Sequence, residues 1–201
     1  MKKMFKTMTA AVLALALTLS LAACGVNPTK QAEAAVSGML DAAKVLDFEA
    51  IGKYTGAEEI FGSADELDQI PGGKDLLQSL LGKMKYKILS SEQTDEETVY
   101  VATKITAVDM KPVFTQFMSK AMEYILAHIF DAPSDEEIEA EVMKILTELL
   151  DAPDLATVDT EVAIKVVLTE DGWKVDGAET LVEAMLGGLE EAAAEFGSLF
   201  G

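Results

Sequence analysis

Apolar residues recur along this chain with two different spacings. From residue 30 to 46 they return every three or four positions, which predicts an amphipathic helix. A shorter helix is expected to begin after Asp47, which can act as its N-terminal cap, and to end at Gly56. A less regular helical stretch covers residues 64–81 and is interrupted at 71–73. The first part of the chain is therefore predicted to be helical.

The spacing then changes to two, which is typical of strands with one buried face. Alternate residues are apolar at 84–88 and at 99–107, and a polar run at 92–97 separates them. These segments predict a β-hairpin. The alternation returns at 162–168. The Asp171-Gly172 pair that follows this segment predicts the tight turn of a second hairpin.

Two more helical segments lie between the predicted hairpins. Asp109 is expected to cap the first helix, with Pro112 in the first turn, where its missing N–H group is tolerated. Ser134 and Glu137 have the spacing of a capping box and predict the start of the second helix. Residues 110–152 are thus predicted to form a helical hairpin inserted between the strands.

Together these elements predict an α+β fold. We expect a curved antiparallel sheet packed against the N-terminal helices, with the helical hairpin as an insertion and a C-terminal helix from 178 to about 200 that is loosened at Gly187 and Gly188. A chain of this length and apolar content is sufficient for one core. Residues 31–201 are therefore assigned to a single domain.

Three segments carry a resemblance to known folds. The opening VSGMLDAAKVLDFEAIGKYTG at 36–56 resembles the helix-turn-helix start of the nuclear-transport-factor-2-like and cystatin-like cone folds. The strand segments VYVATKITAVDM at 99–110 and VAIKVVLTEDGWKV at 162–175 are similar to lipoprotein domains of unknown function that are common in Gram-positive bacteria. The resemblance covers about residues 31–180 and implies a small curved sheet wrapped around a long helix.

The N-terminal segment is predicted to be a lipoprotein signal peptide covering residues 1–23. Its apolar run at 8–23 follows three lysines and is shorter than the ~20 residues of a membrane-spanning helix. Leu21, Ala22, Ala23 and Cys24 resemble a lipobox. That resemblance implies cleavage before Cys24, a lipid on its sulfur, and a short tether at 24–30 to the extracytoplasmic face of a membrane. A plain secretory signal and an uncleaved helix are the alternatives.

The exported part of the chain is strongly acidic. The leader holds three of the 16 basic residues and none of the 35 acidic ones, so the remainder has 13 lysines and a formal charge of −22. All the basic residues are lysine, and a basic footprint for nucleic acid is missing, so we expect no nucleic-acid partner. Cys24 is the only cysteine, which excludes disulfides within the chain.

Sequence motifs for catalysis are also missing. His128 is the only histidine and lies among apolar residues, so it is interpreted as a structural side chain. No serine lies in a nucleophile elbow, and Gly72-Gly73-Lys74 lacks the other residues of a P-loop. The acidic clusters at 95–97 and 135–137 are interpreted as solvated surface. We expect no catalytic residue, no metal ion and no cofactor.

Two groups of apolar residues remain as candidate binding sites. A cone fold often encloses a pocket between its sheet and helices, although aromatic residues near it also serve as ordinary core. The candidates for lining this pocket are Phe48, Tyr54, Tyr86, Tyr100 and Trp173. The helical hairpin either covers the sheet, as a lid or a docked element, or exposes an apolar surface to a partner. The candidate lid residues are Phe114, Phe117, Met118 and Met122.

The sequence therefore predicts a membrane-anchored, non-enzymatic lipoprotein. Its domain is expected to bind either a small apolar ligand or an envelope protein. An enzyme built in the same kind of pocket is the alternative, because one fold supports both functions. A purely structural protein of the cell envelope is the third possibility.

Overall fold

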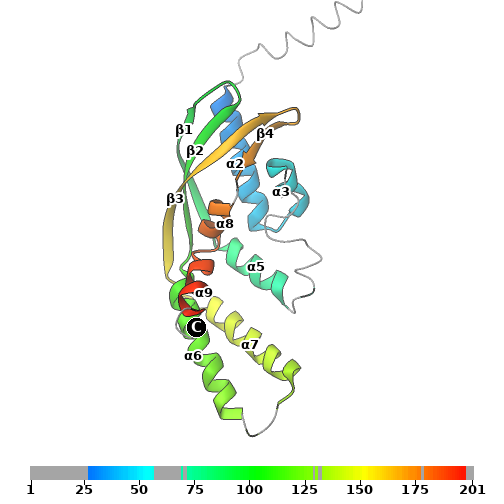
Figure 1. The fold of residues 1–201 in the computed structure, drawn as a ribbon, viewed down its shortest axis with the longest axis vertical. Coiled ribbons are helices and arrows are strands. Elements are labelled where there is room, and N and C mark those ends of the chain that lie inside the picture. Colours follow the sequence, from blue (N-terminus) through cyan, green and yellow to red (C-terminus); the bar gives the residue numbers. More distant parts are fainter. Residues whose placement is uncertain are drawn as a thin grey trace, which may run out of the picture.

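The computed structural model describes residues 27–56, 69, 72–128, 130, 133–177 and 179–197. Figure 1 shows an elongated α+β arrangement in which helices cover one face of a sheet, as predicted. In chain order the elements are α2 (Pro28–Lys44), α3 (Phe48–Thr55), α5 (Gly73–Gly82), β1 (Lys85–Gln93), β2 (Thr98–Val108), α6 (Met110–His128), α7 (Asp135–Leu150), β3 (Thr157–Thr169), β4 (Gly172–Asp176), α8 (Glu179–Met185) and α9 (Leu189–Gly197).

The sheet has the order β1-β2-β3-β4, and all neighbouring strands are antiparallel. Alternate residues of β2 from Val99 to Ala107 are buried, and those between them are partly or largely exposed. Val99 pairs with Val166 of β3, and Val101 with Ile164, so both strands bury the same face. The predicted period of two is confirmed for this pair of strands.

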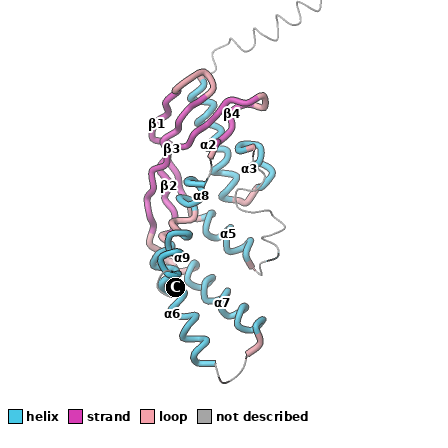
Figure 2. The backbone as a smooth tube through the Cα atoms, in the orientation of Figure 1, coloured by secondary structure: helices cyan, strands magenta, loops and turns pink. Residues whose placement is uncertain are grey.

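Helix α2 packs its apolar side against this buried face of the sheet (Figure 2). Val36, Met39 and Leu40 are fully buried there. Gly38 allows the ring of Tyr54 from α3 to approach, because an added Cβ would lie 2.2 Å from Tyr54 Cζ. The predicted Asp47 cap of α3 is confirmed, since its carboxylate accepts the Ala50 N–H at 3.0 Å.

Helix α2 begins two residues earlier than the sequence analysis expected. Asn27 caps it by accepting the Thr29 N–H at 3.0 Å, and Pro28 occupies the first turn. The expected tether at 24–30 therefore overlaps the helix. Cys24 itself lies outside the described residues.

The inserted helical hairpin forms an arm, defined here as α6 and α7, that extends beyond the end of the sheet (Figure 1). Asp109 caps α6 by accepting the Lys111 N–H at 3.1 Å, and the capping box of Ser134 and Glu137 opens α7. Both caps were predicted. The base of the arm is buried in a second apolar cluster that includes Val108, Val113 and Leu150.

The expected C-terminal helix is two shorter helices in the structure. Helix α8 ends in a Schellman motif, in which the N–H groups of Gly187 and Gly188 donate to the carbonyl oxygens of Ala184 and Glu183. Both glycines have positive φ, and α9 begins directly after them. The chain turns here because two consecutive left-handed residues stop the helix. Ala178 and residues 198–201 lie outside the described part.

Candidate functional site

Four of the five aromatic residues expected to line a pocket pack against the main core. These are Phe48, Tyr54, Tyr86 and Trp173, and each is half-buried. Two of them also bind polar groups of α2. Tyr86 OH donates to Asp41 Oδ1 at 3.0 Å, and Trp173 Nε1 donates to Gln31 Oε1 at 2.8 Å. The four side chains therefore join α2 and α3 to the strands.

This packing changes the pKa of the Tyr86 phenol. Its pKa is raised above the ordinary value by burial first, and by its hydrogen bond to Asp41 second. The group consequently stays protonated and acts as a donor. This arrangement stabilises the helix-sheet contact and provides no acid or base near neutral pH.

Tyr100 lies on the other face of the sheet, away from the other four aromatic residues. It follows the buried Val99, so the strand period of two turns its side chain outward, and it is 39% exposed. Its register neighbours are Glu92 on β1 and Lys165 on β3. The structure therefore separates Tyr100 from the group that the sequence analysis placed together.

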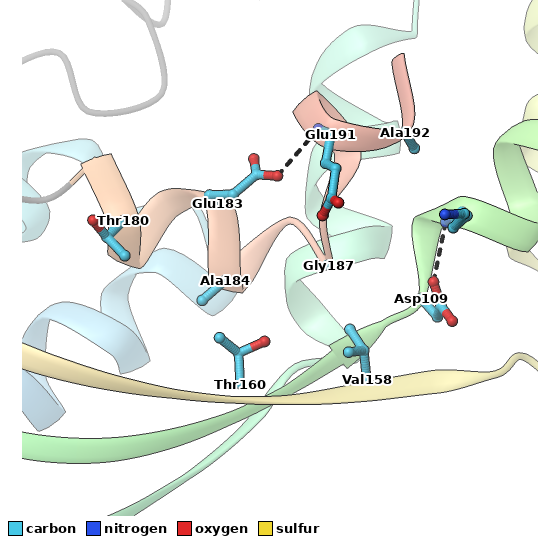
Figure 3. Close-up of a pocket in the computed structure, with 11 residues that line it drawn as sticks. Asp109, Val158, Thr160, Thr180, Glu183, Ala184, Gly187, Glu191 and Ala192 are labelled. Carbon is cyan, nitrogen blue, oxygen red and sulfur yellow. Dashed lines mark hydrogen bonds between the residues drawn. The ribbon is translucent and has the colours of Figure 1, made fainter. Parts of the chain in front are cut away.

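An open cavity of about 400 Å³ lies where α8, α9 and β3 meet. Figure 3 shows Val158 and Thr160 on the strand side, opposite Ala184 and Gly187. The lining residues are Asp109, Lys111, Val158, Thr160, Thr180, Glu183, Ala184, Gly187, Gly188, Glu191 and Ala192.

Two carboxylates of this cavity accept hydrogen bonds from backbone N–H groups. Asp109 Oδ1 accepts the Lys111 N–H at 3.1 Å, and Glu183 Oε1 accepts the Glu191 N–H at 3.3 Å (Figure 3). The cavity has both apolar and polar lining, and two of its three carboxylates already stabilise helix ends. Of its residues, sequence reasoning found only the Asp109 cap and the Gly187-Gly188 interruption. The position of β3 beside α8 and α9 depends on its pairing with β2. The local sequence pattern does not show which strands pair.

Helix α6 carries apolar side chains on two different sides. Val113, Phe117 and Ala121 belong to the side that packs at the base of the arm and along α7. A second set forms what we call the outer stripe, and it lies on another side of the helix, because its later members follow one another or the first at helical spacings of three and four. The outer stripe consists of Met118, Met122, Ile125 and Leu126.

The outer stripe is exposed along the distal part of α6, where Ile125 is 41% exposed. Met118 is half-buried, Met122 is 44% exposed and Leu126 is 62% exposed. Phe130, beyond the end of α6, is 95% exposed. Of the candidate lid residues, Met118 and Met122 lie on the outer stripe, and Phe117 packs into the second cluster.

Phe114 makes a tilted ring contact with Phe117, with centroids 6.2 Å apart. The structure therefore divides the candidate lid residues between the packed side of α6 and the outer stripe, on an arm that extends beyond the end of the sheet (Figure 1).

The crevice between α6 and α7 forms an open groove with mixed lining. Tyr124 and His128 stack with ring centroids 4.4 Å apart, and His128 Nδ1 lies 2.9 Å from the Tyr124 carbonyl oxygen. Across the groove, Glu141 pairs with Lys144 at 2.9 Å, and this contact raises the pKa of Lys144. His128 Nδ1 thus has a backbone partner within its own helix.

Within the described residues, no group of three or more His, Cys, Asp and Glu side chains is placed to hold a metal ion. None of the helices that the structure describes is long and apolar enough to span a membrane.

No protein-family model matches this chain, and no curated protein matches it. Among solved structures, the chain is similar to one described as "a putative lipoprotein (ycdA) from Bacillus subtilis subsp. subtilis str. 168". The two chains are 13% identical with a TM-score of 0.46, and the match covers 74% of this chain and 56% of the other. This chain therefore spans a little over half the length of that protein.

Proposed function

We propose that this protein is a lipoprotein of the extracytoplasmic membrane face that uses its arm to bind another envelope protein. The observation that carries the proposal is the exposed outer stripe of α6. Large exposed apolar surfaces on a folded protein are typical of interaction sites. The half-buried aromatic residues of the expected pocket pack on the core, which favours a protein partner over a small apolar ligand.

The position of the arm relative to the N-terminus supports this function. Figure 1 shows α2 beginning at the end of the molecule opposite the tip of the arm. A lipid on Cys24 would be four residues from Pro28, a reach of about 14 Å at most. The start of α2 would then lie close to the membrane, and the arm would project away from it. Helix α6 alone has 19 residues and a length of about 28 Å.

We also propose that the domain is a cone-like fold, in which a small curved sheet packs on a long helix. A four-stranded sheet holds α2 on one face and leaves the other face without a helical layer among the described elements (Figure 2). In this arrangement the sheet and α2 form a rigid base, and the arm is an insertion between β2 and β3. Insertions on rigid scaffolds commonly carry the binding specificity of a fold.

Site-directed photo-crosslinking in membranes of producing cells tests this function. A photoreactive residue replaces Leu126 on the outer stripe, and a matched control replaces Leu89, which is 43% exposed on β1. We expect a discrete protein adduct from position 126 and none from position 89. The adduct should disappear when Ile125 is also changed to Ser. The same adducts from both positions, or none from position 126, would refute the proposal.

A small polar ligand in the cavity of Figure 3 is the second candidate. Its supporting observation is a lining of small residues beside three carboxylates and one lysine. Mass spectrometry of molecules that co-purify with the protein is the test. A co-purifying molecule that is lost when Ala184 is changed to Leu, in a protein that still folds, would favour this candidate.

A further inference from the structure

Charge is distributed unevenly along the arm. Residues 121–143, which lie between Lys120 and Lys144, contain seven acidic residues and no lysine, and six of the seven lie in the described part of the chain. Glu123, Glu136 and Glu139 among them are exposed. The same segment displays Met122, Ile125 and Leu126. The tip of the arm therefore combines an apolar stripe with a dense negative charge.

We propose that the partner segment that binds the outer stripe is a cationic amphipathic helix. This inference rests on the proposed function and specifies the chemistry of the partner. Apolar residues of such a helix would cover the outer stripe. Its lysine or arginine residues would face the acidic side chains of residues 121–143, of which Glu123 lies on α6 itself and the others follow α6 in the sequence. This is charge complementarity at an apolar contact, which increases both the association rate and the specificity.

Two other occupants are disfavoured by the same charges. A second copy of the chain would bring its own seven carboxylates to the contact, and like charges at an interface cost several kcal/mol. An anionic lipid surface would also be repelled. Under the proposed anchoring, the tip of the arm points away from the membrane that holds the lipid (Figure 1).

The shape of the stripe favours a helical partner. Positions 118, 122 and 125 lie along one side of α6, so their side chains form a ridge nearly parallel to the helix axis. A ridge of this kind packs into the groove between side-chain rows of a second helix. Met118 and Met122 add flexible, polarizable surface, which adapts to partner side chains of different shape.

Peptide titration of the full-length protein in phosphatidylcholine nanodiscs tests this proposal, with empty nanodiscs as the reference. The probe is a labelled 18-residue peptide of leucine and lysine, with leucine at helical spacing along one side. One control peptide has the same composition in scrambled order, and another has glutamate in place of lysine. We expect fluorescence anisotropy to show binding of the probe, at least tenfold weaker binding of the scrambled peptide, and none of the glutamate peptide.

Matched variants locate the binding site. The double variant Ile125→Ser/Leu126→Ser removes the exposed end of the stripe, and Leu89→Ser/Leu168→Ser removes two leucines on the sheet that are each 43% exposed. We expect the dissociation constant for the probe to rise at least tenfold in the first variant and less than twofold in the second.

Two variants with reversed charges compare the arm with the sheet in the same way. Glu123→Lys/Glu139→Lys reverses two exposed charges on the arm, and Glu96→Lys/Glu170→Lys reverses two exposed charges in hairpin turns of the sheet. Both change the net charge equally. We expect at least tenfold weaker binding only for the arm variant, with a loss of affinity at high salt for the wild type. Far-UV circular dichroism checks that each variant keeps its helix content.

Equal effects of arm and sheet variants would overturn the proposal, because binding would then follow net charge alone. Dimerisation that requires Leu126, or binding to anionic vesicles that requires it, would also overturn it by showing a different occupant. These outcomes remain separate from the proposed function. A photo-crosslink from position 126 that persists while the peptides bind equally refutes only the cationic chemistry, and a missing crosslink refutes the function itself.

Discussion

The loop between α8 and α9 provides the strongest structural prediction, because one glycine lies against the backbone of β2. Gly187 has φ +62°, and a Cβ added to it would lie 1.7 Å from the Val108 carbonyl oxygen. Its own carbonyl oxygen accepts the N–H of Met110, the first residue of α6, at 3.0 Å. Changing Gly187 to Ala should therefore push this loop away from the base of the arm.

The magnitude follows from two contributions. A non-glycine residue in the left-handed region costs about 1–2 kcal/mol. Displacement of the loop breaks the Met110–Gly187 hydrogen bond and leaves a buried N–H without a partner, at about 1–3 kcal/mol. We expect Gly187→Ala to lower the free energy of unfolding by about 2–5 kcal/mol, a large part of the roughly 5–15 kcal/mol of a typical domain.

Gly188 provides the matched control. Its φ is +75°, but an added Cβ would meet nothing within 4 Å. Gly188→Ala should cost only the conformational part, about 1–2 kcal/mol. Guanidinium unfolding followed by circular dichroism measures both variants. Equal destabilisation of the two, within about 0.5 kcal/mol, would refute the close approach of Gly187 to Val108 as the larger cause.

Four further predictions concern the anchor, the histidine, the capping box and the arm. Cys24→Ser should abolish lipidation and signal-peptide removal, and wild-type processing of the variant in cell fractions would contradict the anchor. His128→Gln should leave partner binding intact in folded protein, whereas a loss of activity at an unchanged melting temperature would indicate catalysis. Hydrogen bonds from Ser134 lower the pKa of Glu137, so its contribution to stability is present above the unfolded-state pKa and is lost as the pH falls through the folded-state pKa. Acid titration should melt α7 less steeply in Glu137→Gln, and identical curves would contradict this. Amide hydrogen exchange at 112–150 should be faster than in β2 and β3 and should slow when a partner binds, and uniform protection would contradict the exposed arm.

Much of the fold was predictable because its signals are local. The caps at Asp47 and Asp109 and the capping box at Ser134 lie within four residues of the groups that they bind. The buried alternation of β2 is visible in sequence because one face of that strand is almost fully buried. Where a single residue and its near neighbours determine the structure, the sequence analysis agrees with it.

The differences between expectation and structure concern contacts between distant segments. Tyr100 has the same residue type as Tyr86, but the register places it on the opposite face of the sheet. The sequence analysis groups the candidate lid residues of α6 together, while the structure divides them between a packed side and an exposed side. Helical periodicity alone does not distinguish these sides, because the distinction depends on where the neighbouring helix lies.

The charge of the arm affects how its exposed apolar stripe would behave between two copies of the chain. Without the seven carboxylates of residues 121–143, Met122, Ile125 and Leu126 would favour contact with the same residues of another copy. At physiological ionic strength the Debye length is about 8 Å, so carboxylates on two arms in contact repel each other before much of this charge is screened. A lysine-rich partner experiences attraction over the same distance. The acidic side chains of residues 121–143 would therefore oppose self-association and select a basic partner through one electrostatic field.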